Sequence, residues 1–282
     1  MTLIRQFIRH GQFRCGQVWK NSLNQIMPHR WTGRIKPVSA MVRVKNEAQF
    51  LAPSILSIAG LVDEIIIVDN QSSDATPDII AGLSRAVGPK LKTFSYAHAV
   101  TRVGSEFNEL FHTNPQSPRL LNNYYNWCLA RCSQPFVMKW DGDMIALTEF
   151  AEELNRFKKS QTLQFDFGGH NLSSDCKHLL TWAAGIEPRI FPKAFFKFGG
   201  GSYGGEQLEG WVNACNVFRT EKPLYAHMKY CKLDPGSNQT PEFRKSLEAS
   251  IQIAGPTPAT INRDVEHWLR QTEISLRAEN GV

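Results

Sequence analysis

Three short apolar runs in the first half of the chain each end in a polar or acidic turn, which limits the folds available to it. The runs Val38–Val44, Glu64–Val68 and Pro135–Met138 are rich in apolar and β-branched residues, as buried strands are. Segments with helical spacing of apolar residues lie between them. Strands that alternate with helices pair in parallel through right-handed crossovers. The sequence therefore predicts an α/β fold with a mostly parallel, twisted sheet flanked by helices.

Acidic side chains follow each of these predicted strands. Glu47 comes after the first strand, Asp69 ends the second, and Asp141 and Asp143 follow the third. In parallel sheets ligands bind beyond the carboxyl ends of the strands, so we expect these residues to lie close together. Two carboxylates one residue apart suit Mg²⁺ or Mn²⁺, and such an ion can hold a diphosphate. The alternative is that Asp69, Asp141 and Asp143 only cap their turns, a role that we expect for Asp74.

The rest of the chain adds helices, further strands and two segments without clear periodicity. Helices are expected at residues 48–61, 77–86, 120–131, 148–159 and 263–278, and strands at 91–96, 163–172, 187–191 and 223–229. Residues 98–118 show no clear period, and the glycine-rich residues 198–205 are too irregular for a dinucleotide-binding loop. We expect 198–205 to form a loop.

The positive charge of the chain lies in its first residues. The net charge is +6, but residues 1–37 carry seven Lys or Arg and no Asp or Glu, which leaves 25 basic against 26 acidic residues elsewhere. A nearly neutral body makes a nucleic-acid-binding role improbable, because that role requires a basic folded face. Apolar residues at helical spacing in the arm predict either contact with an anionic membrane through residues 1–36 or a helix that is solvated or packed on the domain.

No apolar run approaches the roughly 20 residues needed to span a bilayer. The first residues also lack the continuous apolar core and small-residue cleavage site of a signal peptide. We therefore expect the protein in the cytoplasm, with peripheral contact to the inner membrane face as a hypothesis.

Three motifs in this order resemble glycosyltransferase family 2, the inverting nucleotide-sugar transferases of the GT-A fold. They are Val42–Glu47, Val68–Thr76 and Asp141–Asp143, and the resemblance extends over roughly residues 38–230. Asn122–Trp127 precedes the acidic motif as it does in many bacterial members, which implies the bacterial surface-polysaccharide type.

The resemblance implies a domain organisation within the 282 residues. A basic arm would occupy residues 1–37, and a GT-A catalytic domain residues 38–232. That domain would consist of a nucleotide half, residues 38–145, and a smaller, mixed acceptor half, residues 146–232. A polar, helical tail would form residues 233–282.

The resemblance also implies roles for the acidic residues. Asp69 should contact the uracil or other base, and Glu47 should lie nearby on the base or ribose. Asp141 should face the ribose or a metal-bound water, and Asp143 should coordinate the metal, Mn²⁺ or Mg²⁺. His227 would be the late histidine found near the metal in some members, with a structural histidine as the alternative.

The resemblance further implies a carboxylate that acts as the general base. Glu206 is the first candidate and Glu209 the second, because both lie in the acidic segment that follows the glycine-rich residues. For Arg189 we expect a surface ion pair, with contact to a phosphate or an acidic acceptor as the alternative.

The expected function is a divalent-metal-dependent, inverting glycosyl transfer. The donor would be a nucleotide sugar, expected to be a UDP-sugar, and the acceptor a glycan or lipid-linked saccharide of a bacterial surface polymer. One rival is a sugar-nucleotide pyrophosphorylase, but Lys45, Asn46 and Glu47 stand where such enzymes have a glycine-rich phosphate loop. The other rival is a catalytically inactive family member that binds nucleotide or glycan as a scaffold.

Overall fold

A computed structural model describes residues 35–101, 104–181, 184–203, 206–210, 216–232 and 252–279 of the chain. The basic arm lies almost entirely outside these residues, so its predicted membrane contact stays a prediction. Within the described part, no helix is both long enough and apolar enough to cross a bilayer.

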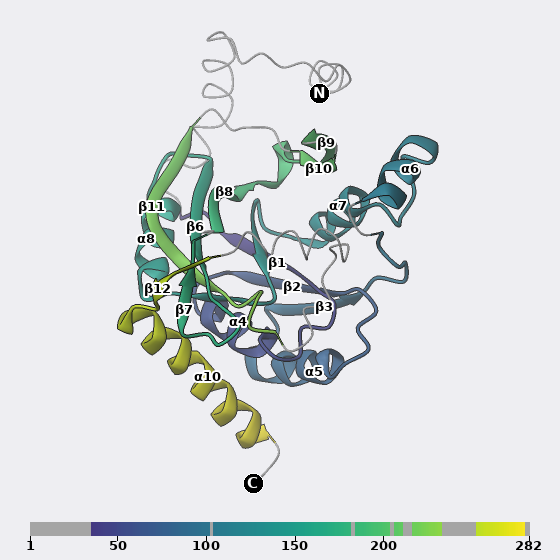
Figure 1. The fold of residues 1–282 in the computed structure, drawn as a ribbon. Helices are drawn as coiled ribbons and strands as arrows, with labels where there is room; N and C mark the ends of the chain where they lie inside the picture. Colours follow the sequence, from purple (N-terminus) through teal and green to yellow (C-terminus); the bar gives the residue numbers. More distant parts are fainter. Residues whose placement is uncertain are drawn as a thin grey trace. The chain divides into compact units, whose positions relative to one another are not determined.

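The centre of the molecule is an eight-stranded sheet in the order β3-β2-β1-β4-β8-β6-β11-β5. Its first four strands are parallel to one another. They are β1 (Val38–Val44), β2 (Glu64–Asp69), β3 (Leu91–Ser95) and β4 (Phe136–Asp141). These strands confirm the predicted α/β architecture, and Figure 1 shows β1, β2 and β3 side by side.

The other half of the sheet is mixed. Here β8 runs antiparallel to β4 and β6, β11 runs parallel to β6, and β5 is antiparallel to β11. The strands are β5 (Met144–Ala146), β6 (Gln164–Asn171), β8 (Ala184–Pro192) and β11 (Val217–His227). Four of the seven neighbouring strand pairs in the sheet are thus parallel.

Helices cover both faces of the parallel strands. Figure 1 shows α4 (Leu51–Ala59) and α5 (Thr76–Val87) on one face, and α7 (Leu121–Arg131) on the other. The remaining helices are α6 (Ser105–Thr113), α8 (Thr148–Lys159), the 3₁₀ turn η1 (Lys193–Phe195) and α10 (Ala259–Glu279). Their positions confirm the predicted helices at 48–61, 77–86, 120–131, 148–159 and 263–278.

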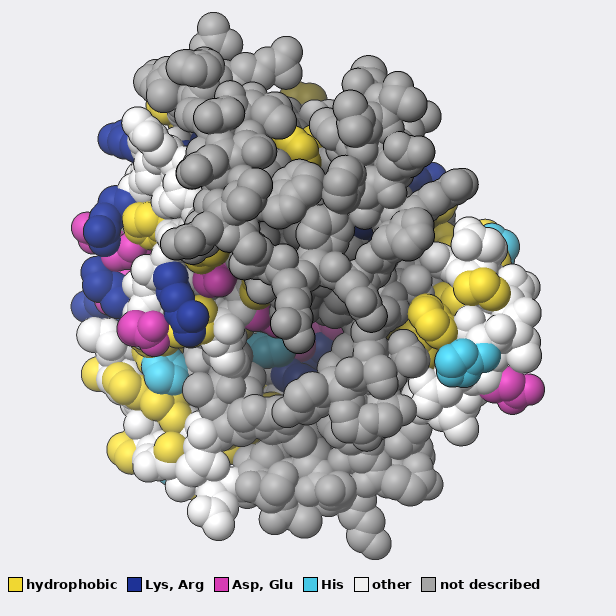
Figure 2. Space-filling model, turned by 90° about the horizontal axis from the view of Figure 1, so that it is seen from above, with side chains coloured by type: hydrophobic (Ala, Val, Ile, Leu, Met, Phe, Trp, Pro, Cys, Tyr) yellow, Lys and Arg dark blue, Asp and Glu magenta, His cyan; other side chains and the backbone are white. Residues whose placement is uncertain are grey.

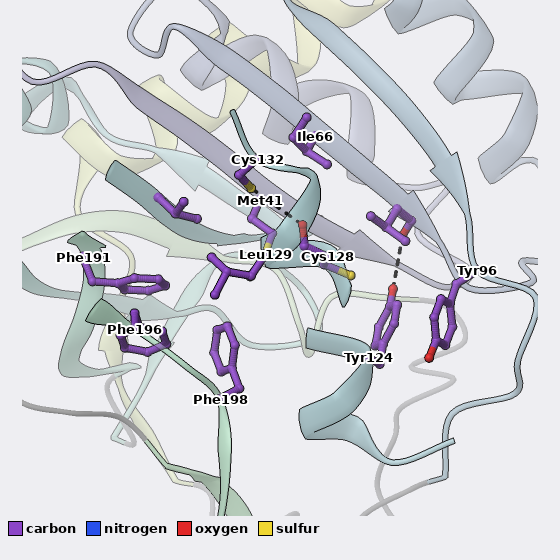
Figure 3. Close-up of a cluster of buried hydrophobic side chains, with 12 residues drawn as sticks. Met41, Ile66, Tyr96, Tyr124, Cys128, Leu129, Cys132, Phe191, Phe196 and Phe198 are labelled. Carbon is purple, nitrogen blue, oxygen red and sulfur yellow. Dashed lines mark hydrogen bonds between the residues drawn. The ribbon is translucent and has the colours of Figure 1, made fainter. Parts of the chain in front are cut away.

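A buried cluster joins α7 to the parallel strands (Figure 3). Met41 of β1 and Val137 of β4 point to the same face, where Cys128 and Leu129 of α7 cover them. Phe191 and Phe196 stack in the same cluster with ring centroids 3.5 Å apart. The burial of these apolar surfaces holds α7 against the sheet. The cluster therefore fixes the segment that leads into β4 and its acidic end.

A second cluster includes the C-terminal helix. Ile261 and Val265 of α10 pack with Phe50 and Ile145, at the start of α4 and in β5. Before α10, β12 (Ile253–Pro256) pairs antiparallel with β7 (His178–Leu180). The end of the chain thus contributes apolar side chains to the same body as the acidic motif.

Two segments differ from the sequence-based expectation. Residues 98–118 contain α6, whose only fully buried side chain is Phe107, so its apolar face is too narrow to give a clear period. The expected loop at 198–205 is wrong for residues 199–203, because β9 (Gly199–Tyr203) pairs antiparallel with β10 (Glu206–Gly210). Glycine weakens a strand signal, since it has no side chain to pack.

Candidate active site

The register of the parallel strands brings the acidic turns to one edge of the sheet. Val44 of β1 lies opposite Asp69 of β2, and Arg43 of β1 lies opposite Asp141 of β4. Glu47, Asp69 and Asp141 therefore follow adjacent strand ends, as expected for a ligand site in such a sheet. Figure 2 shows acidic, basic and histidine side chains together near the centre of one face of the molecule.

Backbone-to-side-chain hydrogen bonds join the turn after β1 to the turn after β2. Asn46, in a left-handed conformation with φ of 57°, accepts a hydrogen bond from the Ser73 amide at 2.8 Å. The Glu47 amide donates to Thr76 Oγ1 at 2.8 Å. Asp69 accepts from the amide and hydroxyl of Ser72, so its carboxylate is held within its own turn. These bonds preorganise the two turns.

Asp74 has a structural role. Its carboxylate accepts hydrogen bonds from the amides of Ala48 and Thr76, at 3.1 and 3.0 Å. These bonds lie at the start of α5, and they also connect the turn to the residues after β1. Asp74 was expected at the N-cap, but Ala75 occupies that position of α5, and Asp74 binds the Thr76 amide from the residue before it.

Asp141 is held between two arginines. Arg43 Nη2 donates to Asp141 Oδ1 at 2.8 Å, and Arg189 Nη1 donates to Oδ2 at 3.2 Å. Arg43 also lies over the Tyr125 ring, 3.8 Å from its centroid. Burial alone would raise the pKa of Asp141, but Arg189 and Arg43 outweigh it and hold that pKa below its usual range. Asp141 is therefore a fixed anion.

Arg189 is buried, which corrects the expectation of a surface ion pair. It is 5% exposed, and besides Asp141 its guanidinium contacts Glu187 at 2.6 Å and the Tyr225 hydroxyl at 2.9 Å. Burial would lower the pKa of Arg189, but the acidic neighbours raise it above its ordinary value. The burial of Arg189 could not be predicted from the local sequence. It results from the position of β8 in the middle of the sheet, where β8 pairs with both β4 and β6.

Asp143 lies between His227 and Lys232. Its Oδ1 atom is 3.2 Å from His227 Nε2, and its Oδ2 atom is 2.6 Å from Lys232 Nζ. The pairing of β5 with β11 sets this geometry, since His227 lies opposite Met144 and the Met228 amide donates to the Asp143 carbonyl at 2.8 Å. Burial would raise the pKa of Asp143, but His227 and Lys232 lower it below its usual range.

Glu47 completes this group of charges. Its Oε1 atom is 2.7 Å from Lys232 Nζ, while Oε2 is buried and has no hydrogen-bond partner among the described residues. Burial and the nearby Asp143 raise the pKa of Glu47 to about 8, although Lys232 acts in the opposite direction. A β-carbon on Gly142 would approach Glu47 Cγ to 3.2 Å and Val44 Cγ1 to 3.0 Å. The glycine of the acidic motif thus lets Glu47 pack closely.

Asp143 and His227 are the two side chains that would hold a divalent ion. No three His, Cys, Asp or Glu side chains within the described ranges are grouped closely enough to form a metal site alone. Mg²⁺, however, is commonly bound by one or two carboxylates together with substrate phosphates. Asp143 Oδ1 and His227 Nε2 are 3.2 Å apart, and adjacent ligands of an octahedral ion lie about 3 Å apart. The unpartnered Glu47 Oε2 adds a further oxygen close by.

The candidate bases lie on β10, where only the backbone is described. Glu206 pairs with Tyr203 and Glu209 with Gly200 in the β9–β10 hairpin. The side chains of Glu206 and Glu209 lie outside the described part of the structure, so their assignment as bases stays a prediction.

Two cations of the site, Arg43 and Lys232, were not singled out from the sequence, and Arg189 was named only with a surface ion pair as the expected role. A charged residue inside the apolar run Val38–Val44 is a signal that could have identified Arg43, because a buried charge needs a partner. Lys232 offers no such signal, since it follows the end of β11 among other polar residues.

Comparison with known proteins gives one sequence match. The model of glycosyl transferase family 2 matches residues 39–104. No curated protein matches the chain.

Similar solved structures include S. aureus TarS and M. tuberculosis glucosyl-3-phosphoglycerate synthase. TarS is 14% identical with a TM-score of 0.44, covering 68% of this chain and 60% of its own. The synthase, crystallised with Mn²⁺, UDP and phosphoglyceric acid, is 20% identical with a TM-score of 0.31, covering 49% of this chain and 43% of its own. This chain thus spans less than two thirds of either protein, and these likenesses carry no argument about its substrates. Residues 39–104, which contain β1, β2 and β3, carry the sequence pattern of glycosyl transferase family 2.

Proposed function

We propose that this protein is a glycosyltransferase that takes a sugar from a nucleotide-sugar donor, a UDP-sugar, with the help of Mn²⁺ or Mg²⁺. The family match at residues 39–104 supports the class of reaction. The observation that carries the proposal is the grouping of Glu47, Asp143 and His227 at the sheet edge where Asp69 and Asp141 also lie. A site of this composition suits a nucleoside diphosphate with a divalent ion.

Asp141 and Asp69 would bind the nucleoside. Arg43 and Arg189 keep Asp141 ionised and fixed, so its carboxylate is a strong acceptor for the hydroxyls of a ribose. Asp69, positioned by Ser72 in the turn after β2, would accept from the base. Glu47 would lie nearby on the base or ribose.

Asp143 and His227 would hold the divalent ion. Such an ion neutralises the negative charge that grows on the departing diphosphate. The acceptor hydroxyl needs a base, because it is a poor nucleophile at neutral pH. Glu206, or else Glu209, would take its proton as the hydroxyl attacks the face of the sugar opposite the diphosphate, which gives inversion.

The acceptor in this proposal is a glycan or lipid-linked saccharide of a bacterial surface polymer. Residues 1–36 would bring the enzyme to the inner membrane face. Flotation of anionic liposomes with the full chain, and with a form lacking residues 1–36, tests this point. Equal flotation of both forms would eliminate the membrane contact.

A catalytically inactive scaffold is the second candidate. It is favoured by one observation, namely that Asp141 and Asp143 are already neutralised by cations of the protein itself. A scaffold would bind the nucleotide sugar without transferring or hydrolysing it. Release of UDP from a bound UDP-sugar over hours would rule out that candidate.

The test of the proposed function is thermal unfolding with Mn²⁺ and a panel of nucleotide sugars. A ligand at one hundred times its dissociation constant adds about 2.7 kcal/mol of stability. For a domain of this size that stabilisation raises the melting temperature by roughly 5–11 °C. Asp143→Asn should abolish the shift, whereas Asp78→Asn, which alters an exposed residue of α5, should retain it. The proposal is refuted if none of the nucleotide sugars raises the melting temperature of the wild-type protein in the presence of Mn²⁺.

A further inference from the structure

Lys232 contacts Asp143, the carboxylate that would also bind a divalent ion. Its ammonium lies 2.6 Å from Asp143 Oδ2 and 2.7 Å from Glu47 Oε1. Asp143 is buried, with 5% of its side chain exposed, and Lys232 and Glu47 are partly buried, each with 14% of its side chain exposed. The buried, ionised Asp143 needs a counter-charge in the absence of metal, and Lys232 supplies it while it also contacts Glu47.

A divalent ion on Asp143 would change this balance. The ion would share a carboxylate with an ammonium that now contacts it directly, and like charges at such a distance repel strongly where water is scarce. The ion would compensate Asp143, so the ammonium would no longer be required there. Lys232 Nζ would then lie farther from Asp143 than it does without metal.

The backbone near Lys232 is held while the side chain can rotate. The Met228 amide donates to the Asp143 carbonyl at 2.8 Å, the Cys231 amide to the Met228 carbonyl at 2.9 Å, and Cys231 Sγ to the Ser173 carbonyl at 3.0 Å. A lysine ammonium on a flexible four-carbon stem can move several ångströms from such an anchor. Glu47 Oε1 would remain within its reach, and the ammonium could then donate to a further anion close to Asp143.

The diphosphate of the donor is that anion. An ion on Asp143 and His227 would be completed by phosphate oxygens, which places two negative phosphates next to Lys232. An ammonium binds phosphate through charge-assisted hydrogen bonds. Lys229, on the same segment, lies in the electrostatic field of Asp143 and Asp141 but makes no ion pair with any described residue.

We propose that Lys232 is an internal counter-ion of Asp143 and Glu47 that transfers to the donor's diphosphate when a divalent ion binds. The inference rests on the proposed function for the identity of the anion, but not for the competition between Lys232 and the metal. It makes Lys232 a positioning residue that couples the two binding events. Metal alone should bind weakly, and metal with a nucleoside diphosphate should bind well.

The first arm of the test measures Mn²⁺ binding to the protein without nucleotide, by electron paramagnetic resonance or calorimetry. Lys232→Met removes the competing charge and should tighten Mn²⁺ binding at least tenfold. Lys232→Arg keeps the charge and should leave the affinity weak. Lys222→Met is the matched control, because Lys222 lies on β11 and pairs with buried Glu153 at 3.0 Å. It should bind Mn²⁺ as the wild type does.

The second arm measures UDP binding at saturating Mn²⁺. Lys232→Met should bind UDP at least tenfold more weakly than the wild type, while Lys222→Met should not differ. Lys232→Met should thus bind Mn²⁺ more tightly and UDP more weakly. A misfolded variant would bind both ligands less well, so the two results together distinguish the proposed role from misfolding.

Each result bears on a different part of the proposal. Unchanged or weaker Mn²⁺ binding by Lys232→Met overturns the counter-ion role. Unchanged UDP binding overturns the contact with the diphosphate. Failure of the wild type to bind any nucleoside diphosphate refutes the proposed function and the diphosphate contact together, while the first arm still decides the competition with metal.

Discussion

Replacement of Arg189 by methionine tests the buried charge arrangement around Asp141. The variant retains a long apolar side chain but loses the guanidinium contacts to Asp141, Glu187 and Tyr225, at 3.2, 2.6 and 2.9 Å. Methionine limits the cavity that a smaller residue would leave. The expected loss of stability is therefore mainly electrostatic.

The magnitude follows from what remains after the change. Removal of one partner of a buried ion pair costs about 3–5 kcal/mol. Asp141 keeps Arg43 as a partner, and Glu187 keeps a weaker contact with Lys139 at 3.9 Å. Both carboxylates are 30% exposed, so water compensates part of the loss. We expect Arg189→Met to lower the free energy of unfolding by about 3 kcal/mol, at the low end of that range.

Urea unfolding and thermal melting measure this effect. A loss of 3 kcal/mol corresponds to a melting temperature lowered by roughly 6–12 °C in a domain of this size. A double-mutant cycle with Asp141→Asn should give a coupling energy above about 1 kcal/mol, because the two side chains are in contact. Arg270→Met is the control, since Arg270 pairs with Glu266 at 3.5 Å on the exposed face of α10 and should cost about 0.3–0.5 kcal/mol.

Two outcomes would refute the reasoning. A loss below about 1 kcal/mol for Arg189→Met would mean that the guanidinium is not the main support of Asp141 and Glu187. A coupling energy near zero with Asp141→Asn would mean that the contact has no net energetic value.

Three further predictions concern backbone space and a buried carboxylate. Gly169→Ala should destabilise by about 1–3 kcal/mol in urea unfolding, because a β-carbon there would lie 2.4 Å from the Tyr225 carbonyl oxygen; an unchanged midpoint would contradict this packing. Gly142→Ala should weaken Mn²⁺-dependent UDP binding by displacing Glu47 a few tenths of an ångström, with a melting temperature close to that of the wild type. Burial would raise the pKa of Glu64, but hydrogen bonds from Lys92, Ser39 and Ser133 lower it to about 2. The stability that Glu64 contributes is thus present above its ordinary pKa of 4.5 and lost as the pH falls towards 2. Glu64→Gln should lower the free energy of unfolding by about 1–3 kcal/mol at pH 7, and this loss should be smaller at pH 3. A loss that does not depend on pH would refute the lowered pKa of Glu64.

The parallel half of the sheet could be predicted because its signals are local. β1, β2 and β4 are short apolar runs, and α4, α5 and α7 carry their own helical period. The alternation of strands and helices then predicts that the strands are parallel, without any knowledge of long-range contacts. The same reasoning brought Asp69 and Asp141 to one edge, and their register confirms that placement.

The partners of the acidic residues could not be predicted in the same way. Arg189 reaches Asp141 only because β8 inserts antiparallel beside β4, a pairing that no local pattern encodes. Lys232 meets Asp143 because β11 returns beside β5. The carboxylates of the site can therefore be identified from the sequence. The cations that balance their charge can be identified only from the tertiary fold.

The pairing of β5 with β11 has a consequence for how the protein is made. Asp143 and His227 are 84 positions apart, so the histidine leaves the ribosome roughly 4–17 s after the aspartate at ordinary rates of synthesis. During that interval the parallel strands can assemble, but the carboxylate of Asp143 has neither His227 nor Lys232 beside it. Closure of so long a loop is slow compared with local pairing. The acidic motif thus acquires its counter-charges in a late step of folding, and a nascent chain that stalls before β11 exposes an incomplete sheet to the cell's chaperones.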